Sequence, residues 1–184
     1  MTISIALAIP NAQWVEARAA ACVRLVEALG LRHGEPVTGA EVIARRLFTD
    51  RKPNREWSMD LWQWGASTGA THLLQLQDDI VPAPNFWPAL RAMLTAVPGK
   101  VIGLQSQHPL GRNLAHIGRR WYRSRAWLVG CQYVLPLQGP DSVHEMLKWL
   151  DAYPHVVANS IGEDVTISTW LRETGRDCWH PLPA

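Results

Sequence analysis

The feature that most constrains this chain is an apolar run that ends in two adjacent carboxylates. Residues Thr71–Pro82 read THLLQLQDDIVP, which has the length and composition of a buried β-strand. Pro82 and Pro84 cannot continue a central ladder, so the run predicts a strand with Asp78 and Asp79 at its carboxyl end. In open α/β sheets this edge is where ligands bind.

Two neighbouring carboxylates also constrain the chemistry at this edge. They repel each other unless a cation or a proton lies between them. Oxygen ligands suit hard divalent ions, and a phosphate-bearing substrate completes the coordination shell of such an ion. Asp78 and Asp79 therefore predict a Mg²⁺ or Mn²⁺ site. The plainer interpretation, a polar turn after a strand, stays open beside it.

Strands and helices alternate along the chain. Residues Ile3–Ile9 predict a first buried strand with a turn at Pro10 and Asn11. Apolar residues at three- and four-residue steps predict a helix over 12–29, which Asn11 caps and Gly30 ends. Further helices are expected over 55–67, 84–97, 141–150 and 160–173, and strands over 101–104 and 127–136. Residues 31–38 are a weak strand candidate, and 41–48 fit a helical turn or a strand.

This alternation predicts an α/β fold in a single domain, with a Rossmann-like, mixed but mostly parallel sheet flanked by helices. The 184 residues suffice for one full core, and 47% hydrophobic with 18% charged residues is a globular composition. No apolar run reaches the roughly 18 residues of a membrane span, and the N-terminus lacks signal-peptide features. We therefore expect a cytoplasmic protein. Three separated cysteines without a CxxC favour neither disulfides nor zinc.

Charge is unevenly distributed, although the net charge is only +2. No acidic residue lies between Asp79 and Asp141, and residues 106–124 predict a long basic loop with aromatic side chains next to the arginines. Two interpretations stay open: a solvated loop whose arginines pair with acids elsewhere, or a surface that binds phosphate groups. The lysine and arginine residues between Asp79 and Asp141 are Arg91, Lys100, Arg112, Arg119, Arg120, Arg123 and Arg125.

A second acidic pair, Glu163 and Asp164, opens the last predicted helix. Acidic side chains favour the first turn of a helix because of its dipole, so helix capping is one interpretation of Asp164. His180 follows this helix near the C-terminus and is either a metal ligand or a simple terminal histidine.

In their order and context, these motifs resemble the GT-A fold of nucleotide-sugar glycosyltransferases. Gln77-Asp78-Asp79 is similar to the DxD motif of that family, and Gly162-Glu163-Asp164 is similar to its xED motif. The strand that contains Gly130 corresponds to a small-residue strand, and His180 corresponds to a C-terminal metal histidine. The phrases HLLQLQDDIVP and GEDVTISTWLRETG look like small bacterial and phage-encoded members.

The resemblance implies a single catalytic domain over 1–184, with a nucleotide-sugar-binding half at 1–82 and an acceptor and catalytic half at 83–184. Asp79 and His180 would ligate Mn²⁺ or Mg²⁺, and Gln77 departs from the family because it replaces an acid. Asp164 would be the base of an inverting reaction, and Glu163 would orient the acceptor. Contacts to the donor would come from Pro10, Asn11, Asp78, Gly130, Arg123 and Arg125.

The implied activity is metal-dependent transfer of a sugar from a nucleotide-sugar donor to a hydroxyl acceptor. The ion would neutralise the departing diphosphate, and the base would take the acceptor proton. The acid-free basic segment and the phage-like motifs suggest a hydroxymethylated base in DNA as acceptor, flipped out of the stack. The compartment would then be the host cytoplasm. The alternatives are a metal-dependent nucleotidyltransferase or nuclease, and a non-catalytic module that binds sugar nucleotides or nucleic acid.

Overall fold

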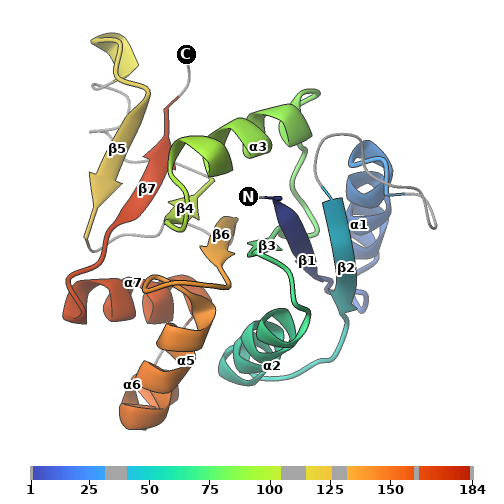
Figure 1. Cartoon of the computed structure of the whole chain (residues 1–184). Helices are drawn as coiled ribbons and strands as arrows, with labels where there is room; N and C mark the ends of the chain where they lie inside the picture. The colour runs from blue at the N-terminus through green and yellow to red at the C-terminus, as the bar shows by residue number, and fades with distance from the viewer. Residues whose placement is uncertain (1, 32–40, 105–114, 126–131, 160–161, 183–184) are drawn as a thin grey trace.

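The computed structural model of the chain describes residues 2–31, 41–104, 115–125, 132–159 and 162–182. Within these residues, seven strands form one mixed sheet (Figure 1). In chain order they are β1 (Ser4–Pro10), β2 (Glu41–Phe48), β3 (His72–Gln75), β4 (Val101–Gly103), β5 (Trp121–Ser124), β6 (Tyr133–Pro136) and β7 (Cys178–Pro181). In space their order is β2-β1-β3-β6-β4-β7-β5.

Most strands run in one direction. β1 is parallel to β2 and β3, and β4 is parallel to β7, whereas β6 is antiparallel to both β3 and β4. β5 at the edge is antiparallel to β7. The carboxyl ends of β1, β2, β3, β4 and β7 therefore share one edge of the sheet. In β1 the residues Ile5–Ile9 are all completely buried, as expected for a parallel strand covered on both faces.

Helices cover both faces of the sheet. They are α1 (Glu16–Ala28), α2 (Asn54–Ser67), α3 (Phe86–Ala96), α5 (Val143–Ala152), α6 (Pro154–Asn159) and α7 (Glu163–Glu173). One hydrophobic cluster joins α1 and α3 to the sheet, and the other joins α2, α5 and α7 to it. Figure 1 shows α2, α5, α6 and α7 gathered below the strands and α3 above them.

The two clusters follow from the alternation of side chains along each strand. In β3, Leu73 packs in the cluster with Trp62 of α2, and Leu74 packs in the cluster with Leu90 of α3. This arrangement confirms the predicted α/β class, the single domain and a mixed sheet with helices on its faces. The sheet is less parallel than predicted, because three of the six described strand pairings are antiparallel. The arrangement is consistent with a Rossmann-like fold.

The structure corrects the expected start of the first helix. α1 begins at Glu16, and its N-cap residue is Val15 rather than Asn11. The reason lies in the sheet: the backbone N–H of Asn11 donates to the carbonyl of Phe48 at 2.9 Å, so Asn11 still extends the β1–β2 pairing. Helix α5 is capped by Ser142, whose side chain accepts from the N–H of Glu145.

Other segments differ from the expectations in instructive ways. Residues 41–48, for which strand and helix were both open, form strand β2. Strands β5 and β7 and helix α6 fall where no element was expected, because four to six residues carry too little periodicity to show one. Of the expected strand over 127–136, the described part is a strand from Tyr133. The strand candidate at 31–38 lies almost wholly outside the described residues.

The described cysteines are core residues. Cys22 and Cys178 are buried free thiols. Burial raises the pKa of Cys178 to about 12, so this thiol stays protonated and unreactive. In the described ranges, none of the helices has the length and apolar character needed to cross a bilayer.

Candidate functional site

A cavity of about 250 Å³ lies at the carboxyl ends of β1, β2 and β3. Pro10 and Asn11 reach it from β1, Gln77 from the segment after β3, and Glu163 from the first turn of α7. The end of β1, the segment after β3 and the start of α7 are far apart in the sequence, and they meet at the edge where the parallel strands end. Three of the predicted site residues, Pro10, Asn11 and Glu163, line this one cavity.

Aromatic and charged side chains complete the wall of this cavity. Trp14, Phe48 and Trp57 supply aromatic surface, and Arg18, Lys52 and Asp50 supply charge. A hydrogen bond from Lys52 to Asp60, 2.6 Å long, raises the pKa of the ammonium group, and the nearby carboxylates raise it further. Lys52 therefore remains a cation at neutral pH.

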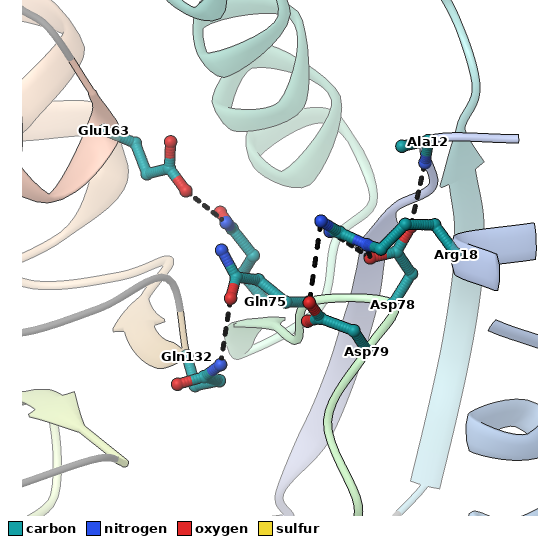
Figure 2. A network of polar contacts seen from close by, with 8 residues as sticks. Ala12, Arg18, Gln75, Asp78, Asp79, Gln132 and Glu163 are labelled. Carbon is teal, nitrogen blue, oxygen red and sulfur yellow. Dashed lines mark hydrogen bonds and ion pairs between the residues drawn. The ribbon is translucent and has the colours of Figure 1, made fainter. Parts of the chain in front are cut away.

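Asp78, the first carboxylate after β3, is an internal anchor. Its side chain is 0% exposed, its Oδ2 accepts from the N–H of Ala12 at 2.8 Å, and its Oδ1 accepts from Nε of Arg18 at 2.6 Å. A second guanidinium nitrogen of Arg18 pairs with the same Oδ1 (Figure 2). Asp78 therefore ties the end of β3 to the start of α1, and it does not line the cavity.

Asp79, the second carboxylate, is in a different environment. Its side chain is 44% exposed, and Oδ2 lies 3.5 Å from Nη1 of Arg18. The same guanidinium thus lies against both carboxylates, as Figure 2 shows. The cation that two adjacent carboxylates require is supplied in part by the protein itself.

Arg18 is a residue of the candidate site that the sequence analysis missed. It lies 60 residues from Asp78 in the sequence, and no local pattern links a helix arginine to a carboxylate in another segment. The available signal was weak: α1 follows β1, so its first turns come close to the carboxyl edge of the sheet. Arg18 also lines the cavity with a side chain that is 36% exposed.

Glu163 lines the cavity and is bonded to a buried side chain of the sheet. Only 3% of its surface is accessible, and its Oε1 accepts from the side-chain amide of Gln75 at 2.8 Å. Gln75 itself is 0% exposed. The first residue of the second acidic pair is thus anchored by a neutral amide, not by a cation.

Asp164 has a more local role in the structure. It is half-buried in the first turn of α7, and its Oδ1 accepts from the N–H of Val165 at 2.9 Å. It is absent from the cavity wall formed by the described residues, whereas Glu163 is part of that wall. Of the two interpretations of Asp164, these contacts favour an interaction with the start of the helix over catalysis.

His180 lies on β7, away from the acidic pair after β3. It is 0% exposed, its ring stacks on Tyr122 with centroids 4.5 Å apart, and its Nε2 is 3.1 Å from Oγ of Ser124. Strands β6 and β4 lie between β3 and β7, which at the usual strand spacing separates their axes by about 14 Å. The structure does not bring His180 to Asp79.

The remaining predicted donor contacts are also distant or undescribed. Arg123 and Arg125 pair with Asp177 at 3.4 and 3.6 Å, beside β5 at the far edge of the sheet. Of the two interpretations of the basic segment, this pairing favours arginines that meet acids elsewhere in the chain. Gly130 lies outside the described residues.

The carboxylates at this edge fit only one kind of divalent-ion site. In the part of the chain that the structure describes, no three His, Cys, Asp or Glu residues gather closely enough to hold a metal ion. Mg²⁺, however, is usually bound by one or two carboxylates together with substrate phosphates and water, not by a cage of protein ligands. Asp79, with its exposed carboxylate, fits that kind of ion held jointly with a phosphate-bearing substrate.

Comparisons with known proteins add no relative. Neither a protein-family model nor a curated protein matches the sequence. A function for this chain must therefore be argued from the chemistry of the site.

Proposed function

We propose that the protein is a glycosyltransferase of the GT-A type that moves a sugar from a nucleotide-sugar donor to a hydroxyl acceptor. The observation that carries this proposal is the meeting of Glu163 with Pro10, Asn11 and Gln77 in one cavity at the carboxyl edge of the parallel strands. This is the edge where open α/β sheets bind nucleotides. The motif order of the sequence supports the same class.

The cavity has groups for each part of a nucleoside diphosphate. Trp14 and Trp57 offer faces on which a base can stack. Lys52 is a cation in the cavity wall that can bind a phosphate oxygen. Arg18 already pairs with Asp78 and Asp79, so only its remaining N–H groups can donate to the nucleotide-sugar donor. A volume of about 250 Å³ is below the range of about 300–1,000 Å³ for whole ligand sites, so we assign the cavity to one portion of the donor.

A Mn²⁺ or Mg²⁺ ion is part of the proposal, with Asp79 as its protein ligand. Such an ion neutralises the charge that develops on the departing diphosphate. Arg18 lies beside Asp79 and holds that carboxylate near the end of β3. Asp79 is not part of the described cavity wall, but its ion-pair partner Arg18 is, so the ion would lie at the rim of the cavity beside Arg18.

Glu163 is the proposed general base, in place of Asp164. A base must come within hydrogen-bond reach of the acceptor hydroxyl, and of the two residues only Glu163 lines the described cavity. Because Oε1 of Glu163 is already an acceptor for Gln75, the carboxylate approaches the cavity in a defined orientation. A base that acts from the side opposite the departing diphosphate would give an inverting reaction, which is the stereochemistry we propose.

The acceptor remains the hydroxymethylated base in DNA that the sequence suggested. Arg119 and Arg120 are exposed, and Arg125 keeps 77% of its side chain accessible although it pairs with Asp177. These arginines precede or flank β5, so they supply a basic edge that can contact a phosphate backbone. Binding to duplex DNA should therefore weaken steeply as salt rises.

A ligand screen followed by product analysis tests the function. We expect one nucleotide sugar to raise the Tm of the protein in the presence of Mn²⁺ and not in its absence, because a bound ligand stabilises the folded state. With that donor and hydroxymethylated DNA, mass spectrometry should detect the mass of one sugar on the base. Transfer of the nucleotide, or cleavage of the DNA, would instead identify a nucleotidyltransferase or a nuclease.

A further inference from the structure

Four buried polar side chains form a hydrogen-bonded series that ends at the cavity. They come from α2, β6, β3 and α7, and none is more than 3% exposed: Trp62, Tyr133, Gln75 and Glu163. Trp62 Nε1 donates to the hydroxyl of Tyr133 at 3.0 Å, the hydroxyl donates to Oε1 of Gln75, and Nε2 of Gln75 donates to Oε1 of Glu163 at 2.8 Å. Figure 2 shows the last of these bonds.

The direction of this series is set by its first member. An indole N–H can only donate, so the oxygen of Tyr133 must accept from Trp62. The hydroxyl proton of Tyr133 then goes to Oε1 of Gln75, which turns the amide NH₂ toward Glu163. The reverse orientation of the amide would place its oxygen against a carboxylate oxygen. Oε1 of Glu163 is therefore approached by a hydrogen-bond donor.

Packing alone does not account for these residues. Apolar side chains, among them Leu73, Leu135 and Ile167, surround the series in the same cluster. A buried hydroxyl or amide is unfavourable unless it is hydrogen-bonded, and apolar residues would fill the same space without that requirement. What the polar residues add is a fixed orientation for one carboxylate at the cavity wall.

We infer that Gln75 is a positioning residue, which holds Glu163 in place as the proton acceptor and is itself oriented by Tyr133 and Trp62. This inference rests on the proposed function for its catalytic meaning. The hydrogen bonds set the position of Glu163 relative to the acceptor hydroxyl, and a displacement of 1 Å at a reacting group can lower a rate about a hundredfold.

The test is a double-mutant cycle on the rate of sugar transfer. Gln75→Leu should lower kcat about a hundredfold, while the dissociation constant of the donor is unchanged because the leucine does not reach the cavity wall. In a Glu163→Gln background the same change should have no further effect, because the residue through which Gln75 acts is already inactive. An equal loss in both backgrounds would overturn the inference.

Two further variants guard against a general loss of structure. Tyr133→Phe removes the group that orients Gln75 and should lower kcat about tenfold, and it carries the test if Gln75→Leu does not fold. His72→Gln is the matched control: His72 is a buried polar residue on the same strand, 2% exposed, with no bond to the series. We expect it to leave kcat at the wild-type value, and a loss like that of Gln75→Leu would contradict the inference.

Thermal unfolding separates this inference from the proposed function. Wild-type protein that transfers no sugar would overturn the function. The Tm values of Gln75→Leu, Glu163→Gln and the double variant then decide whether the two side chains are coupled. Non-additive shifts in Tm support the link between Gln75 and Glu163, and additive shifts overturn it.

Discussion

The two acidic pairs, Asp78-Asp79 and Glu163-Asp164, are alike in burial but differ in what their buried member is bonded to. In each pair the first carboxylate is buried, with Asp78 0% and Glu163 3% exposed, and the second is more accessible. Asp78 is neutralised by the guanidinium of Arg18, whereas Glu163 accepts from the neutral amide of Gln75. The pairs therefore differ in the charge of the partner that accompanies the buried member.

This difference separates an anchor from a reactive group. A carboxylate bonded to a guanidinium and a backbone N–H has its charge and both oxygens satisfied, so Asp78 belongs to the fold. A carboxylate that accepts from an amide is held in a defined orientation with no cation beside it, so Glu163 is the carboxylate presented at the cavity wall. Adjacent acids in a sequence thus do not predict which member carries the chemistry.

The largest expected effect is on catalysis, from the two members of the second pair. Glu163→Gln should lower kcat for sugar transfer about a thousandfold, because a general base contributes about 10²–10⁴-fold. Asp164→Asn should lower it less than about tenfold, because Asp164 is absent from the described cavity wall. Steady-state kinetics with saturating donor measure both, and the reverse ranking would return the role of base to Asp164.

The next effect is on stability, from the anchor of the first pair. Arg18→Gln should lower the free energy of unfolding by about 4 kcal/mol, because it leaves the buried Asp78 charge without a partner. Adding Asp78→Asn should recover most of that loss, since asparagine can still accept from Ala12 without a charge. Urea unfolding of the two variants checks this, and a double variant as unstable as Arg18→Gln would contradict it.

His72, a buried side chain on β3, should make stability depend on pH. Burial lowers the pKa of His72 from 6.5 to about 4, so the folded protein holds the imidazole neutral. The unfolded chain takes up that proton near pH 6.5, so acid favours the unfolded state. Stability present above pH 6.5 is lost as the pH falls toward 4, by about 2 kcal/mol between pH 7 and 5.

The control for this pH effect is His72→Gln, which keeps a polar side chain but cannot titrate. Comparing the free energy of unfolding of wild type and variant at pH 7 and pH 5 isolates the histidine from the carboxylates. An unchanged difference between the two pH values would show that His72 is not the responsible group.

The smallest expected effect on stability comes from the accessible member of the first pair. Asp79→Asn should change the free energy of unfolding by less than about 1 kcal/mol, because its ion pair with Arg18 is exposed. It should nevertheless abolish the Mn²⁺-dependent rise in Tm with a nucleoside diphosphate. A variant that retains this rise would remove Asp79 from the metal site.

Much of the fold could be predicted because its signals are local. The buried run of β1 and the spacing of apolar residues in α2, α3 and α5 show in consecutive residues. Strands β5 and β7 could not be predicted, because four residues become a strand only through their pairing partner. The same limit applied to Asn11, whose backbone N–H continues the pairing with Phe48, so that the helix begins only at Glu16.

For the candidate site, the sequence predicted the edge of the sheet and the residues Pro10, Asn11 and Glu163 that line its cavity. It did not predict Arg18 or Gln75. Each acts on a carboxylate 60 or 88 residues away, and a contact over that separation has no periodic signature. Nor could it show that His180 lies beyond two intervening strands from β3.

By itself, then, the sequence determined the alternation of strands and helices, the burial of the parallel strands and the places where carboxylates follow them. These depend on the preferences of neighbouring residues. Only the tertiary structure decided which carboxylate receives a cation, which receives an amide, and which of them faces a cavity. The physical reason is that partners for buried polar groups are chosen by where the sheet and its helices bring side chains together.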